Sequence, residues 1–117
     1  MEPDLKPRRG DLFWVDFEQA RGTEQKGRRP ALVVQNDRGN EHSPYTVVVA
    51  VSSAPLPRVY PFTVPLAKGE GNLPRDGHIN CAQILTIDRS RLTARIGKLS
   101  EERMRQVDAA LRYELDL

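Results

Sequence analysis

Arg29 lies at a position where the local backbone is expected to fix the direction of its charged side chain. It precedes Pro30, and a proline ring disfavours the helical region for the residue before it, so Arg29 is expected to be extended. Pro30 suits the first position of a strand, where a missing N–H costs no ladder bond. Arg29 is thereby placed at a loop–strand junction, from which a side chain still reaches solvent. An ordinary surface arginine fits the same spacing, so this pattern alone leaves both readings open.

The sequence offers little support for a catalytic site built on histidines, metal ions or a phosphate-binding loop. The histidines, His42 and His78, are far apart, and each is expected at the surface. There is no closely spaced His and Cys set for zinc, and the carboxylates are scattered rather than clustered for two metals. No phosphate-binding glycine loop precedes a helix. Arginine and hydroxyl chemistry at the ends of two strands remains, with Arg29 on one strand and Ser52 and Ser53 on the other.

The chain is predicted to be mainly β with a C-terminal α-helix. Strands are expected at residues 12–17, 31–35, 45–51, 62–66, 78–84 and 92–96, because these stretches are apolar, β-branched or aromatic. In the first strand, Phe13 and Val15 are assigned to the core face. Residues 36–40 read as a turn with a glycine for positive φ. Ser100 is expected to cap a helix whose apolar stripe ends at Leu115. These elements indicate a small β-barrel or strongly bent sheet.

Length and composition indicate one domain spanning residues 1–117. Residues 1–8 are expected to form a flexible arm. No stretch approaches the ~18 apolar residues of a membrane span. Cys81, the only cysteine, is expected to be a small buried residue in a strand. A single cysteine cannot form an internal disulfide, which fits the reducing cytoplasm.

Charge is distributed unevenly along the second half of the chain. Residues 71–99 carry five basic and two acidic groups, whereas residues 100–117 carry three basic and five acidic ones. The pattern is compatible with an anionic ligand on one face of the protein, and equally with solvated surface charge. The net charge of +2 is too small to indicate nucleic-acid binding by itself.

Five segments of the chain, taken in their order, carry a resemblance to a known family. They are residues 9–17 (RGDLFWVDF), 22–30 (GTEQKGRRP), 33–37 (VVQND), 49–53 (VAVSS) and 83–88 (QILTID), followed by the closing helix. Together they cover nearly the whole chain from about Arg9 onward and resemble the MazF/PemK family of toxin endoribonucleases. The resemblance implies an SH3-like barrel that forms a homodimer in the cytoplasm. It also implies a ribosome-independent, sequence-specific ribonuclease that cleaves single-stranded RNA without a metal or other cofactor.

The resemblance also assigns roles. It places the family's catalytic arginine at Arg29 and its hydroxyl residue at Ser52, where family members usually have threonine; Ser53 is the alternative source of the hydroxyl. It makes the loop of residues 18–28 a lid over the RNA site. Further candidates for substrate contact are Thr23, Glu24, Gln25, Lys26, Ser53 and Gln83.

Glu24 is left between two roles, contact with a base and an ion pair with a basic loop residue. The implied partners are single-stranded RNA and a short acidic antitoxin segment. A non-catalytic toxin that inhibits another enzyme such as gyrase, and an SH3-like binding module, are the alternatives from other functional classes. The toxin that inhibits another enzyme would leave Arg29 without a special role.

Overall fold

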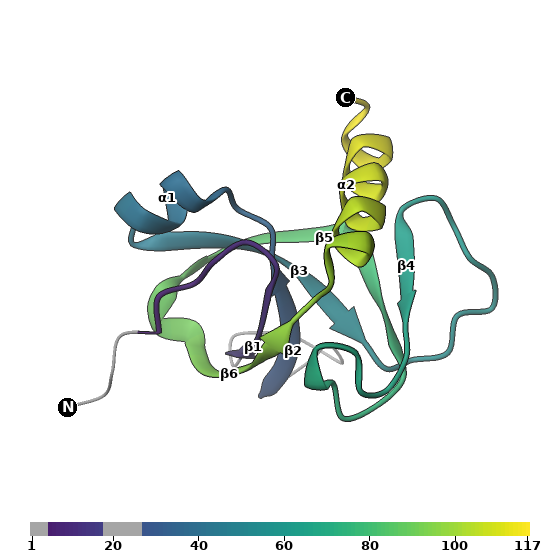
Figure 1. Ribbon diagram of the computed structural model, residues 1–117, viewed down its shortest axis with the longest axis horizontal. Coiled ribbons are helices and arrows are strands. Elements are labelled where there is room, and N and C mark those ends of the chain that lie inside the picture. The colour runs from purple at the N-terminus through teal and green to yellow at the C-terminus, as the bar shows by residue number, and fades with distance from the viewer. Residues whose placement is uncertain (1–4, 18–26) are drawn as a thin grey trace.

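The computed structural model describes residues 5–17 and 27–117. Its main feature is a strongly bent antiparallel sheet, with a long helix standing over one face (Figure 1). The strand order is β4-β5-β3-β2-β1-β6, so β3 and β2 lie in the middle. The elements are β1 (Asp11–Asp16), β2 (Arg28–Val33), α1 (Asp37–His42), β3 (Tyr45–Ser52), β4 (Thr63–Leu66), η1 (Glu70–Asn72), β5 (Gly77–Asp88), η2 (Arg89–Arg91), β6 (Leu92–Lys98) and α2 (Glu101–Leu115).

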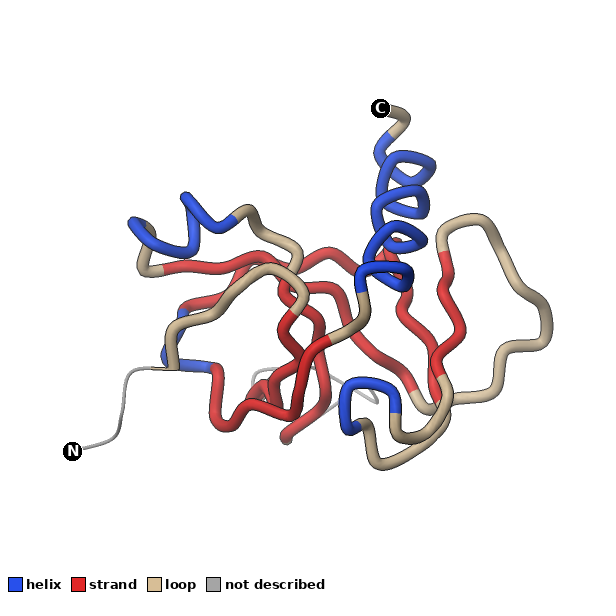
Figure 2. The backbone as a smooth tube through the Cα atoms, viewed as in Figure 1, coloured by secondary structure: helices blue, strands red, loops and turns tan. Residues whose placement is uncertain are grey.

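The loop between β4 and β5 joins the two ends of the bent sheet. This loop contains η1 and packs against β6, the strand at the opposite edge (Figure 2). The amide of Asn72 donates a hydrogen bond to the Ile96 carbonyl oxygen (3.2 Å). A Cβ atom on Gly97 would collide with the carbonyl oxygen of Gly71, so close approach requires glycine there. We call this contact the barrel seam. It closes the predicted barrel.

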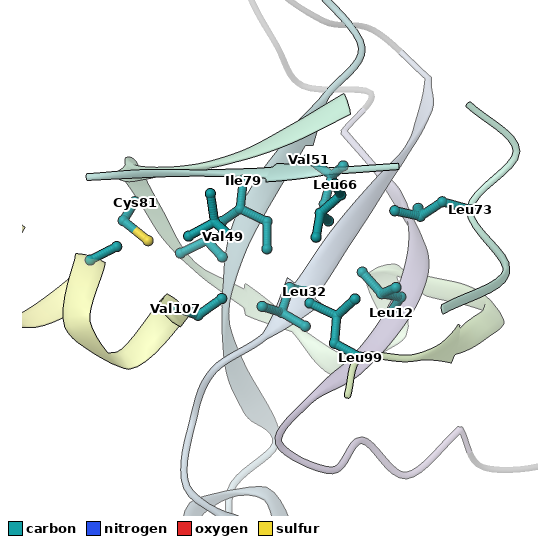
Figure 3. Packing of buried hydrophobic residues seen from close by; sticks show 12 residues of the cluster. Leu12, Leu32, Val49, Val51, Leu66, Leu73, Ile79, Cys81, Leu99 and Val107 are labelled. Atoms are coloured by element: carbon teal, nitrogen blue, oxygen red, sulfur yellow. The ribbon is translucent and has the colours of Figure 1, made fainter. Parts of the chain in front are cut away.

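Both faces of the central strands are buried. Leu32 belongs to the larger hydrophobic cluster, shown in Figure 3 with Val107 of α2 packed nearby. Ala31 and Val33, which alternate with Leu32, belong to a smaller second cluster. The continuous apolar run of β2 therefore predicted burial on both faces correctly.

The assignment of a single core face to β1 was incomplete. Phe13 and Val15 are buried in the second cluster, as expected. Leu12, on the opposite face of the strand, is fully buried in the larger cluster. Because the sheet is bent around one cluster and backed by another, β1 contributes to both.

The closing helix follows its predicted pattern in most details. Ser100 is the N-cap, and its side chain accepts a hydrogen bond from the Arg103 amide (3.1 Å). Val107 and Ala110 are buried against the sheet. Leu115, at the end of the stripe, is 52% exposed because α2 extends beyond the body of the sheet (Figure 1). No described helix has the length and apolar character needed to cross a membrane.

Residues 36–40 form part of a short helix rather than the predicted turn. Asn36 caps α1 by accepting a hydrogen bond from the Gly39 amide (2.8 Å). Gly39 does not need positive φ; it lies in the helix, where a Cβ atom would press against the Gln35 side chain. The capping residue was therefore recognisable, but its local hydrogen bond starts a helix as well as a turn.

Several further boundaries differ from the expectation. β2 runs from Arg28 to Val33 rather than over residues 31–35, so Pro30 is its third residue, and β6 ends at Lys98 rather than at residue 96. β5 continues to Asp88, four residues past its predicted end at residue 84, with a register shift that leaves residues 81–83 as a bulge opposite β3. In the N-terminal segment, Leu5 packs against the second cluster and Pro7 is fully buried. The part of the expected arm that the structure describes is thus anchored by apolar contacts.

Candidate active site

Strand pairing brings the two strand ends together. β2 and β3 pair through Ala31 and Ala50, and continuing this antiparallel register by two residues brings Arg29 level with Ser52. On its other side, Ser52 pairs with His78 of β5. A cavity of about 510 Å³ lies across these strand ends and is lined by Trp14 and by residues 28–30, 51–53 and 73–77. Arg29, Ser52 and Ser53 therefore share one cavity, as the chemistry predicted from their types requires.

The two neighbouring arginines of β2 differ in what they contact. The Arg28 guanidinium lies over the Trp14 ring, 5.4 Å from its centroid, and its Nε donates to Thr93 Oγ1 (3.1 Å). Arg29 is half-buried, and no described residue offers its guanidinium a hydrogen bond or an ion pair. A guanidinium presents its donors in a planar fork that matches phosphate oxygens. Arg29 is therefore available for an anion in the cavity, while Arg28 is held against the wall.

The Ser52 hydroxyl is held by its own turn. Its Oγ accepts a hydrogen bond from the Ala54 amide (3.1 Å), and the residue is half-buried, whereas Ser53 is exposed. Since a hydroxyl both accepts and donates, Ser52 keeps its proton for a ligand oxygen. The backbone of Ser52 is packed against Gly77, where a Cβ atom would lie 2.5 Å from the Ser52 carbonyl oxygen. These contacts orient the hydroxyl of Ser52 more closely than that of Ser53.

His78 is buried, so its expected place at the surface was wrong. It is 7% exposed, and burial lowers the pKa of its imidazole, which keeps the ring neutral at pH 7. The backbone of Ala54, the residue whose amide binds Ser52 Oγ, partly offsets this lowering of the pKa. Through its pairing with Ser52, His78 supports the strand end that carries the hydroxyl. His42 is exposed, as expected.

Cys81 is buried in β5, which confirms its prediction as a structural residue. Burial raises the pKa of its thiol to about 11. At neutral pH the side chain is therefore a neutral thiol, and the nucleophilic thiolate is scarcely populated. Nowhere in the described segments do three or more His, Cys, Asp or Glu side chains gather as metal ligands would.

Several predicted contacts are not among those that line the cavity. Thr23, Glu24, Gln25 and Lys26, together with most of the predicted lid, lie outside the described residues. Gln83 is exposed on the β5 bulge and does not line this cavity. The role of each in substrate contact stays a prediction.

Trp14, whose residue type alone makes it a candidate for base stacking, also lines the cavity. The polar lining further includes Arg28, Arg75 and Asp76, to which the sequence did not assign a role. Among the described residues, the lining carries three guanidinium groups, those of Arg28, Arg29 and Arg75, and the single carboxylate of Asp76, so this part of the lining is basic. The available signal for Arg75 was the basic excess of residues 71–99, which named no single residue.

Comparison with known proteins identifies the family of the chain. Residues 8–115 match the family described as PemK-like, MazF-like toxin of type II toxin-antitoxin system. The Endoribonuclease MazF of Staphylococcus epidermidis is 38% identical over 110 residues, which cover 94% of this chain and 92% of the relative.

Solved structures give the same result. MazF from Deinococcus radiodurans is 29% identical with a TM-score of 0.79, over 97% of this chain and 100% of that one. An endoribonuclease in complex with its cognate antitoxin, from a mycobacterial species, is 26% identical with a TM-score of 0.78, over 95% and 96% of the two chains. From the family match over nearly its whole length, the bent sheet with its closing helix and these relatives, the chain belongs to the PemK-like, MazF-like toxin family of type II toxin–antitoxin systems.

Proposed function

We propose that this protein is a toxin endoribonuclease that cleaves single-stranded RNA at a short sequence, independently of the ribosome. The observation that carries the proposal is the Arg29 guanidinium, which has no partner among the described residues and shares a basic cavity with the Ser52 side chain. The relatives named as endoribonucleases support the same activity. A gyrase-type toxin would leave Arg29 without a special role, and a binding module would hold RNA there without cleaving it.

Arg29 and Ser52 fit the chemistry of RNA cleavage by its own 2′-OH. The 2′-oxygen attacks the adjacent phosphorus in line, gives its proton to solvent water, and forms a new P–O bond. The bond to the 5′-oxygen breaks, and that oxygen takes up a proton from water. The products carry a 2′,3′-cyclic phosphate and a 5′-hydroxyl.

The protein's contribution in this mechanism is to stabilise charge on the phosphorus oxygens. Arg29 donates to the non-bridging oxygens in a fork, and the Ser52 hydroxyl donates to one of them as negative charge develops. A guanidinium stays protonated at neutral pH, so we assign Arg29 electrostatic stabilisation rather than proton abstraction. No step of this mechanism requires a metal.

The activity is directly measurable with purified protein. Incubation with a long single-stranded RNA should give discrete fragments, both with and without a chelator, and primer extension should place the cuts at one short sequence. End analysis should find 2′,3′-cyclic phosphates and 5′-hydroxyl groups. Intact RNA, or cleavage that the chelator abolishes, would contradict the proposal.

We further propose that the protein works in the cytoplasm as a homodimer and is inhibited there by a short acidic antitoxin segment. Exposed apolar residues at the end of α2, Tyr113, Leu115 and Leu117, offer surface for assembly. The basic cavity attracts an acidic chain, and a disordered inhibitor can wrap a large surface. The mycobacterial relative solved with its cognate antitoxin supports such a partner.

The proposed dimer and its complex with an antitoxin can each be tested by measuring the mass in solution. Light scattering at micromolar concentration should give twice the chain mass of 13.2 kDa for the protein alone. Co-expression with the protein encoded beside it should give a larger complex in which RNA cleavage is inhibited. A monomer at neutral pH, or a toxin that co-purifies with nothing encoded beside it and harms no cell, would contradict the proposal.

A further inference from the structure

The loop that enters β5 is tied to the closing helix. Arg103 Nε and Nη2 bind the two carboxylate oxygens of Glu70 at 2.8 and 3.0 Å. This pairing holds the pKa of Glu70 below its usual range, so the carboxylate is charged at neutral pH. Glu70 also accepts from the Ala67 amide (2.7 Å), and Asp76 accepts from the Lys68 amide (2.7 Å). Residues 67–76, the tied loop, are thereby fixed at both ends.

Arg75 extends from this tied loop and lines the same cavity as Arg29 and Ser52. It is exposed, and no described residue forms a hydrogen bond or an ion pair with its guanidinium. Arg28, in contrast, is bound to Thr93 and lies on Trp14. Of the three guanidinium groups that the described residues contribute to the cavity, those of Arg29 and Arg75 are therefore available for an anion.

The two available groups belong to chain segments that approach β3, the strand of Ser52, from its two edges. Arg29 belongs to β2, which pairs with one edge of β3, and the tied loop leads into β5, which pairs with the other edge. Neighbouring strands are ~4.8 Å apart, so two steps separate the backbones of β2 and β5 by about 10 Å. Two guanidinium groups projecting from such places suit two successive phosphates of one strand better than a single phosphate.

We infer that Arg75 binds the RNA phosphate next to the scissile one, from a loop that the Glu70–Arg103 pair holds in place. The inference rests on the proposed ribonuclease function and assigns Arg75 substrate binding, without a part in the chemical step. Its contact is to the phosphate backbone, so it contributes to affinity and register for any sequence.

The first test measures how salt affects binding. The probe is a short mixed-sequence single-stranded 2′-deoxyoligonucleotide, which keeps the phosphates but has no 2′-OH to attack. For single strands, log K changes with log salt by about 0.7 per neutralised phosphate. Arg75→Ala should therefore reduce the slope by about 0.7, whereas Arg75→Lys should keep it because the charge remains.

Arg38→Ala is the matched control, since Arg38 is an exposed arginine on α1 that does not line the cavity. It should leave the slope unchanged. Equal slopes for Arg75→Ala and Arg38→Ala would overturn the inference, whether both match the wild type or both fall.

A second variant tests the tie. Glu70→Gln removes a negative charge, so electrostatics alone would strengthen binding of a polyanion. If the Glu70–Arg103 pair positions Arg75, binding should weaken instead, and adding Arg75→Ala should cause little further loss. Tighter binding by Glu70→Gln would overturn the positioning role of the pair.

Cleavage of a long RNA separates this inference from the proposed function. Arg75→Ala should raise KM several-fold with kcat nearly unchanged, because the contact is made equally in the ground and transition states. If the wild-type protein cleaves RNA but Arg75→Ala behaves as Arg38→Ala does, the inference about Arg75 alone fails. If the wild-type protein cleaves no RNA, the proposed function fails.

Discussion

Replacing Arg29 by alanine should lower the rate of RNA cleavage on the order of 100- to 1,000-fold, the usual cost of losing one donor to a transition-state oxyanion. Arg29→Lys should be nearly as impaired, because an ammonium cannot reproduce the fork that spans two phosphate oxygens. The measurement is single-turnover cleavage of the mapped RNA site. Single turnover isolates the chemical step from product release.

Arg38→Ala again provides the control, because it removes the same charge at an exposed position on α1. Its rate should equal that of the wild type. The thermal midpoint of Arg29→Ala should also be unchanged, because no described residue loses a hydrogen bond or an ion pair. Cleavage by Arg29→Ala at the wild-type rate would exclude Arg29 as the catalytic cation.

The hydroxyl is tested by a matched pair of neighbouring serines. Ser52→Ala should slow cleavage on the order of 100-fold through loss of a donor to the same oxyanion, whereas Ser53→Ala should have a small effect. The Ser52 side chain is half-buried and bound by the Ala54 amide, while Ser53 is exposed. Ser52→Thr should retain activity because it keeps the hydroxyl, and its extra methyl group restricts χ1.

Rates of the two alanine variants decide which serine acts. A slow Ser53→Ala enzyme with a normal Ser52→Ala enzyme would assign the hydroxyl to Ser53. Normal rates for both would leave Arg29 without the proposed hydroxyl partner. The circular dichroism spectra of both variants should match that of the wild type, since neither side chain belongs to either hydrophobic cluster.

Local pattern was enough to predict most of the sheet. The apolar run that contains Leu32 and the β-branched run of β3 are long, and the capped helix after Ser100 has a clear 3.6-residue period. The extended backbone expected at Arg29 followed from Pro30, which restricts it locally, but its role did not. The resemblance to a family, rather than periodicity, supplied the barrel topology and the pairing of Arg29 with Ser52.

Features that depend on distant contacts were not visible in the pattern. His78 is buried because β5 runs between β3 and β4, a neighbourhood set by pairing and not by adjacent residues. Arg75 reaches the cavity because Arg103, on α2, holds the loop through Glu70. No residue next to Arg75 in the sequence indicates that its loop contacts Arg103 or that its side chain lines the cavity. The position of Arg75 therefore follows only from the folded structure.

The pairing of β1 with β6 has a consequence for when the toxin becomes active during synthesis. β1 lies near the start of the chain, but its partner strand begins at Leu92, and Thr93 binds both the Trp14 carbonyl oxygen and the Arg28 guanidinium in the cavity wall. A ribosome therefore makes Arg29 and Ser52 well before the residues that complete their surroundings. Chains that end at a premature stop codon before β6 would carry Arg29 and Ser52 without the assembled cavity, and we expect them to leave the cell's RNA intact.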